Sequence, residues 1–148
     1  MTGAEIISKL PYQKPFIFVD ELLKIDENGI SGTYTFHASS DFYKGHFINN
    51  PVTPGVILTE TMAQIGLVSF GIYLMNKSGE TMDDIQIALT SSEIDFFKPV
   101  FPGEKVFVKS EKEYFRFNKL KCKVDMYNVK NELVCRGKIA GMIAGKMT

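Results

Sequence analysis

One long apolar segment dominates the pattern of hydrophobic and polar positions along the chain. Between Pro54 and Met75 the only charged side chain is Glu60. The pattern predicts a helix that is buried on nearly all sides, with Thr53 as its N-cap and Pro54 in its first turn. The helix is long enough to suggest a membrane span. The polar residues within it and the strand-like segments around it favour instead the core of a sheet.

The remaining chain has the apolar and polar patterning of an antiparallel sheet. We expect a short helix at Ala4–Lys9, a loop at Asp41–Thr53 and a polar linker at Asn76–Asp84. The expected strands are Phe16–Ile25, Ile30–Ala38, Ile85–Thr90, Glu93–Phe97, Val106–Phe115, Lys119–Val129 and Leu133–Ala144. The sequence therefore predicts an α+β fold in a single domain, residues 1–148.

Composition and charge exclude several classes of function. The chain has 148 residues, 45% of them hydrophobic, which is enough for one core. Its 17 acidic and 17 basic residues balance, so the sequence indicates neither nucleic-acid binding nor a membrane-surface role. Glu5 and Lys9 interrupt the short apolar segment at the N-terminus, unlike an export signal. We expect a cytoplasmic protein.

The two cysteines lie in neighbouring predicted strands. A turn at Lys130–Asn131 would pair residues whose numbers add up to about 261, whereas Cys122 and Cys135 add up to 257. The cysteines would then not face each other, so we expect no disulfide. No metal-ligand spacing accompanies them, and we expect no metal site.

Glu60 is the first candidate for chemistry. It lies four residues before Gln64, so both share one face of the predicted helix. Burial raises the pKa of a carboxyl group toward the range in which it can deliver a proton near neutral pH. The alternative is a structural glutamate that fixes a loop or caps a neighbouring element.

His46 is the second candidate, because it lies in a loop rich in proline and glycine just before the helix. A single histidine beside Phe47 is more often a packed or surface residue than a base. Here the backbone N–H groups at the helix start could polarise a carbonyl group beside it. Base, acid and backbone donor form one plausible catalytic set.

Several motifs together resemble one known family. They are Leu10-Pro11, Pro15-Phe16, Val19-Asp20, His46-Phe47, Asn50-Pro51-Val52, Pro54-Gly55-Val56, Glu60, Ala63-Gln64, Phe97-Lys98-Pro99-Val100 and Pro102-Gly103. Their order and spacing are similar to those of the 3-hydroxyacyl-[acyl carrier protein] dehydratases of type II fatty acid synthesis.

The resemblance implies a hot-dog fold, in which an antiparallel sheet wraps a central helix, and a homodimer with active sites at the subunit interface. A trimer of dimers is a larger assembly that it leaves open. His46 of one protomer would take the C2 proton, Glu60 of the other would assist departure of the C3 hydroxyl, and the Gly55 N–H would bind the thioester carbonyl. No metal or organic cofactor is implied.

The implied partner is an acyl carrier protein with an acyl chain linked to phosphopantetheine. An acidic carrier protein needs a basic landing site, for which Lys98, Arg116 and Lys119 are the candidates. The chain departs from the family pattern at Tyr12, Gln13, Ile48, Asn49, Thr53 and Lys98, which leaves the preferred acyl chain open.

Two other functions remain open from the sequence. One is a hot-dog thioesterase, which would release free thiol. The other is a non-catalytic subunit that binds a carrier protein or an acyl chain. A dehydratase dedicated to a specialised lipid or polyene pathway is a further variant of the first hypothesis.

Overall fold

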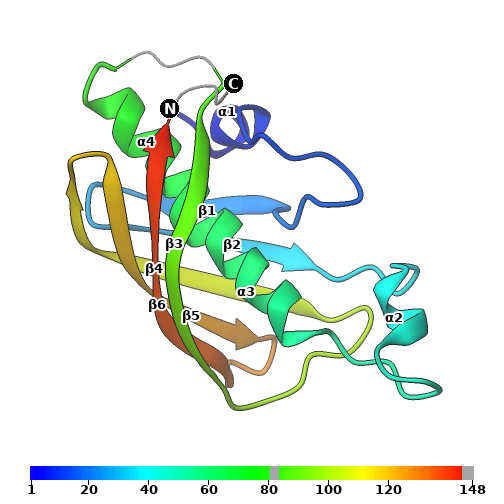
Figure 1. Cartoon of the computed structure of the whole chain (residues 1–148). Coiled ribbons are helices and arrows are strands. Elements are labelled where there is room, and N and C mark those ends of the chain that lie inside the picture. Colours follow the sequence, from blue (N-terminus) through cyan, green and yellow to red (C-terminus); the bar gives the residue numbers. More distant parts are fainter. Residues whose placement is uncertain (81–83, 145–148) are drawn as a thin grey trace.

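The computed structural model describes residues 1–80 and 84–144 and contains one antiparallel sheet and one long helix (Figure 1). The six strands are β1 (Glu21–Ile25), β2 (Gly29–Thr35), β3 (Gln86–Phe96), β4 (Lys105–Arg116), β5 (Lys119–Asn128) and β6 (Leu133–Ala144). Their order in the sheet is β1-β2-β4-β5-β6-β3, so β1 and β3 form the two edges. The sheet curves around the helix, as the hot-dog fold requires, and the predicted α+β class is confirmed.

The helix runs without interruption from Gly55 to Lys77 and lies in the core. It consists of α3 (Gly55–Ala63), a π-helical turn η1 (Gln64–Val68) and α4 (Ser69–Lys77). By length and composition it could cross a membrane, but 72% of its most apolar stretch is buried inside the protein. It is therefore packed as the core helix of a sheet.

The start of this helix differs from the prediction. Pro54 is the N-cap, and the predicted cap at Thr53 is wrong. The Thr53 hydroxyl is instead hydrogen-bonded to the Tyr43 hydroxyl at 2.6 Å, which takes it away from the helix. The first helical residue is Gly55 rather than Pro54.

Other element boundaries also differ for identifiable reasons. The expected strand Phe16–Ile25 is a strand only from Glu21, because the Gln64 side chain bonds the backbone of Phe16 and Phe18 in place of a neighbouring strand. The two strands expected around Thr90 form one strand, β3, with an irregularity between Leu89 and Ser91.

The remaining boundaries shift by a few residues. The first helix, α1 (Gly3–Ser8), and β2 begin and end slightly earlier than expected. The expected loop Asp41–Thr53 contains a short helix, α2 (Phe42–Gly45). The expected linker Asn76–Asp84 begins inside α4, and its residues 81–83 lie outside the described residues.

The hairpin of β5 and β6 has the predicted register. Met126 pairs with Cys135 and Cys122 pairs with Ile139, so the two cysteines are not opposite each other. Both are free and buried, and burial raises their pKa to about 12.

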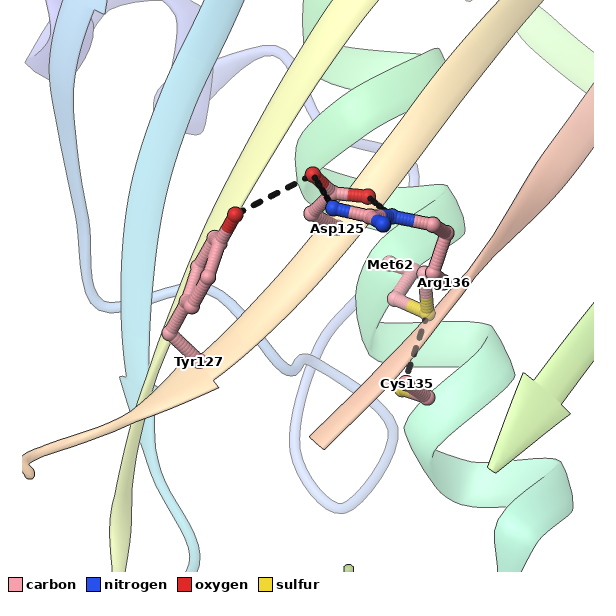
Figure 2. A network of polar contacts seen from close by, with 5 residues as sticks. All are labelled: Met62, Asp125, Tyr127, Cys135 and Arg136. Atoms are coloured by element: carbon pink, nitrogen blue, oxygen red, sulfur yellow. Dashed lines mark hydrogen bonds and ion pairs between the residues drawn. The ribbon is translucent and has the colours of Figure 1, made fainter. Parts of the chain in front are cut away.

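Consecutive residues of β6 face opposite sides of the sheet (Figure 2). The Cys135 Sγ points to the helix and lies 3.4 Å from the Met62 Sδ. The Arg136 guanidinium points outward and donates to both carboxylate oxygens of Asp125, at 2.8 and 3.1 Å. The Tyr127 hydroxyl donates to the same carboxylate at 3.2 Å. The inner face of the sheet is thus apolar and the outer face carries its charges.

Gly137 is expected to be indispensable to the pairing of β3 with β6. A methyl group on it would overlap the Glu93 carbonyl oxygen of the neighbouring strand. We expect Gly137→Ala to lower the free energy of unfolding by about 2 kcal/mol or more, measured by denaturant unfolding. Gly45→Ala, where nothing lies within 4 Å of the added methyl, is the control. Equal stability of both variants would contradict the packing described here.

Candidate active site

The His46 imidazole is held by the backbone of its own loop. His46 follows α2, and its Nδ1 lies 2.8 Å from the Val52 carbonyl oxygen. Because a carbonyl oxygen can only accept, the hydrogen of the neutral ring is on Nδ1. The lone pair is therefore on Nε2, and this half-buried ring can accept a proton there.

The loop around His46 is closed by further backbone bonds. The Val52 N–H donates to the His46 carbonyl at 2.9 Å. Phe47 and Asn50 exchange two N–H···O bonds, both at 3.0 Å. Asn49 has a φ of 57°, which lies in the left-handed region. Glycine adopts this region most readily, and asparagine adopts it more readily than most other residues. The tight turn therefore forms although Asn49 stands where the resembled family commonly has glycine.

Glu60 is half-buried on α3, and its carboxylate accepts a hydrogen bond from the Gln64 Nε2 at 2.9 Å. The predicted polar stripe of these two residues is thus present. Burial raises the pKa of Glu60, and the Gln64 hydrogen bond offsets part of this rise. A carboxyl group in this setting retains its proton to a higher pH than an exposed one, as an acid catalyst requires.

Gln64 connects Glu60 to the N-terminal segment. The fully buried amide accepts from the Phe18 N–H at 2.8 Å and donates to the Phe16 carbonyl at 3.0 Å as well as to Glu60. This connection fixes the carboxyl group. Its partners are backbone groups in an irregular segment, so sequence periodicity could not reveal them.

Tyr12 lies near Glu60. The sequence indicated this residue only as a departure from the family pattern. Burial, and then the charge of Glu60, raise the pKa of Tyr12 to about 12. Its ring lies beside Phe16, with ring centres 6.3 Å apart. The Tyr12 phenol therefore lies close enough to Glu60 for the carboxylate charge to affect it.

Gly55 presents its N–H at the start of the long helix. The Pro54 carbonyl accepts from Ile57 and Leu58, whereas no backbone bond among the described residues uses the Gly55 N–H. A methyl group on Gly55 would lie 3.3 Å from the Phe96 ring, so only glycine leaves the normal clearance there. The free N–H can polarise a carbonyl group that approaches the helix start.

His46 and Glu60 are carried by different elements, the loop that follows α2 and the helix α3. The segment with α2 and the following loop extends to one side of the long helix (Figure 1). Within residues 1–80 and 84–144, no hydrogen bond or ion pair joins the two side chains. Among these residues, no three histidine, cysteine or acidic side chains gather as a metal site would require.

The three predicted carrier-protein contacts do not form one patch within the chain. Lys98 forms an ion pair with Glu132 at 3.0 Å, near the helix start. Arg116 and Lys119 flank the hairpin at the other end of β5, about 30 Å away along the strand.

Of the aromatic residues near the motifs, Tyr43 is buried, whereas Phe47, Phe96 and Phe97 are 56%, 48% and 57% exposed. These three rings are available to a substrate or a second protein. The sequence did not distinguish them from the core.

A curved antiparallel sheet around one long helix defines the hot-dog class of folds, and in this chain a histidine lies in the loop before the helix and a carboxyl group on the helix itself. Comparison with known proteins identifies the family within this class. The sequence model of the FabA-like domain matches residues 10–140, and the chain belongs to this family. The resemblance found in the motifs is confirmed.

The individual relatives agree with this assignment. The chain is 35% identical over 143 residues to a 3-hydroxyacyl-[acyl-carrier-protein] dehydratase FabZ from Allorhizobium ampelinum, covering 96% of this chain and 89% of the relative. It is 31% identical over 144 residues to the protein of the same name from Ehrlichia canis, covering 94% and 93%.

Solved structures show the same fold at low sequence identity. The dehydratase heterocomplex ApeI:P from Xenorhabdus doucetiae superposes with a TM-score of 0.79 at 12% identity, covering 95% of this chain and 91% of that chain. A protein from Streptococcus pneumoniae described as a hypothetical thioesterase, solved with coenzyme A, superposes with a TM-score of 0.59 at 15% identity, covering 86% of this chain and 88% of that chain.

The raised pKa of Glu60 predicts a pH-dependent stability. The folded state holds this proton more tightly than the unfolded chain, so the stabilisation is full below the ordinary glutamate pKa and is lost as pH rises through the raised pKa. Glu60→Gln cannot ionise. Its melting temperature relative to that of the wild type should therefore rise as pH increases from the ordinary glutamate pKa of about 4.3 through the raised pKa of Glu60.

Glu27→Gln is a control for which we expect the opposite dependence of stability on pH. The Lys77 ammonium, 2.7 Å away, lowers the pKa of Glu27, so this carboxylate stabilises above its ordinary pKa. Glu27→Gln should lose stability relative to the wild type as pH rises. The same trend in both variants would contradict a desolvated Glu60.

Proposed function

We propose that this protein is a dehydratase that converts (3R)-3-hydroxyacyl-[acyl carrier protein] to the trans-2-enoyl thioester. The observation that carries this proposal is the Nδ1 bond of His46 to the Val52 carbonyl, which leaves Nε2 as a base. Two relatives above 30% identity over nearly the whole chain have the name of this activity. The proposal covers fatty acid synthesis and related lipid or polyene pathways, in the cytoplasm.

In the proposed reaction His46 Nε2 takes a proton from C2 of the substrate. The electron pair forms the C2–C3 double bond, and the C3–O bond breaks. Glu60 donates its proton to the departing oxygen, which leaves as water. A proton next to a thioester is only weakly acidic, so a base and an acid that act in one step lower the barrier.

The Gly55 N–H has the third role. The thioester carbonyl gains negative charge as C2 loses its proton, and a fixed N–H donor at a helix start stabilises that charge. The proposed site needs no metal or organic cofactor, because the substrate supplies both the leaving group and the activating carbonyl.

We infer further that two copies of the chain complete each site, with His46 from one protomer and Glu60 from the other. The two side chains have different hydrogen-bond partners among the described residues, Val52 for His46 and Gln64 for Glu60, which is compatible with this arrangement. The edge strand β3 is mostly exposed over its eleven residues and offers unpaired backbone groups to a second copy. Apolar side chains near this edge are also exposed: Val56 is 76%, Leu89 44% and Phe97 57% exposed. Their exposure favours a second copy that covers this surface.

The proposed macromolecular substrate is an acyl carrier protein with its phosphopantetheine-linked acyl chain. Lys98 is the favoured contact, because it lies at the same end of the sheet as Gly55. Arg116 and Lys119 would serve the same carrier protein only if a second copy brought them near that end.

We expect the wild type to dehydrate carrier-protein-bound 3-hydroxyacyl thioesters and both His46→Ala and Glu60→Gln to lose about a hundredfold to ten-thousandfold in kcat. The assay follows formation of the enoyl thioester, with folding checked by circular dichroism. His37→Ala, at the other histidine, which is exposed, is the matched control and should retain the wild-type rate.

Different failures of this assay point to different functions. Release of free thiol without an enoyl product would identify a thioesterase. Binding of the acylated carrier protein without turnover, unchanged in His46→Ala, would identify a binding subunit. Either result would overturn the proposal.

A further inference from the structure

A buried pair of hydroxyl groups joins the two arms of the loop that holds His46. The Tyr43 hydroxyl and the Thr53 hydroxyl are 2.6 Å apart and share a hydrogen bond. Tyr43 is in α2, three residues before His46, and Thr53 lies next to Val52, whose carbonyl fixes the ring. The bond therefore spans the base of the loop.

Both partners of this bond are anchored in the body of the protein. Tyr43 is 6% exposed and Thr53 is 4% exposed. The Thr53 N–H donates to the Val100 carbonyl at 2.8 Å, and Val100 belongs to the buried core. By contrast, the loop residues Phe47 and Ile48 are 56% and 82% exposed. The tip of the loop is thus exposed, and the Phe47 ring packs there on the His46 ring, with ring centres 4.0 Å apart.

We propose that the Tyr43–Thr53 hydrogen bond positions His46 for proton abstraction. Its function is to keep α2 and the Val52–Thr53 segment at a fixed separation, so that the Val52 carbonyl stays within reach of Nδ1. If the two arms separate, the ring loses the acceptor that keeps the hydrogen on Nδ1. Nε2 then no longer points to the C2 proton with a free lone pair. Tyr43 and Thr53 are positioning residues, and their role rests on the proposed function of His46.

Two substitutions that nearly preserve side-chain volume test this role, because Thr53→Val and Tyr43→Phe each remove one hydroxyl. Thr53→Ser retains the hydroxyl and loses only a methyl group. We expect kcat to fall about tenfold to a hundredfold in the first two variants, as a small displacement of a catalytic group does, with little change in KM. Thr53→Ser should recover most of the rate. Thr33→Val, the same change at another buried threonine, should leave kcat within about twofold.

The double variant Tyr43→Phe/Thr53→Val separates positioning from stability. Each single variant leaves a buried hydroxyl without its partner, which lowers the melting temperature, whereas removal of both hydroxyls relieves that cost. We expect the melting temperature of the double variant to recover while its kcat stays low. Recovery of kcat together with the melting temperature would overturn the inference.

NMR of the ring nitrogens of labelled histidine gives a result that does not depend on turnover. His46 should show hydrogen on Nδ1 in the wild type and a mixture of tautomers in Thr53→Val, while the signals of His37, the other histidine, stay unchanged. Unchanged His46 signals would overturn the inference. If the wild type catalyses no dehydration, the proposed function fails, and these spectra alone then decide whether the bond positions the ring.

Discussion

The buried amide of Gln64 is the interaction on which the rest of the site depends. Its carbonyl accepts from Phe18, and its NH2 group donates to Phe16 and to the Glu60 carboxylate. One side chain thus satisfies backbone groups of an irregular segment that no strand pairs, and orients the acid of the proposed reaction. A buried amide with all these partners is stable only in one arrangement, because each missing bond would leave a desolvated polar group.

The π-helical turn begins at this same residue. The Ser69 N–H and hydroxyl both bond the Gln64 carbonyl, the hydroxyl at 2.7 Å. Ser110 of β4 donates to the Gly66 carbonyl within the turn at 2.9 Å, so helix and sheet approach closely. Single π turns often occur where a helix has a functional residue. Here the turn lies directly after the segment that holds Glu60 and Gln64.

Different interactions set the protonation and orientation of the two candidate catalytic side chains. Glu60 depends on the rigid helix and on desolvation, which raises its pKa. His46 depends on backbone hydrogen bonds of an exposed loop, which fix its tautomer. A helix embedded in a sheet can hold one group very accurately, but a second group must approach from outside, and a loop from another copy can supply it.

The sequence predicted the long helix, the last three strands and the hairpin register well, because periodicity reports which side chains face the core. It failed at Thr53, where a distant tyrosine competes for the hydroxyl that would otherwise cap the helix. It also failed at Phe16–Phe18, where the Gln64 side chain replaces a strand as hydrogen-bond partner.

In the candidate site, the pattern of the long helix and its preceding loop identified Glu60 and His46 as candidates, and the family resemblance added Gly55. The bonds from Gln64 to Phe16 and Phe18 could not be predicted, because they join residues far apart in sequence.

The most direct test of a site shared between two chains is to mix the two inactive variants. His46→Ala and Glu60→Gln, refolded together in equal amounts, should form mixed dimers with one intact site each and recover about a quarter of wild-type activity per chain. No recovery, in mixtures shown to contain mixed dimers, would contradict the account and place both groups in one chain.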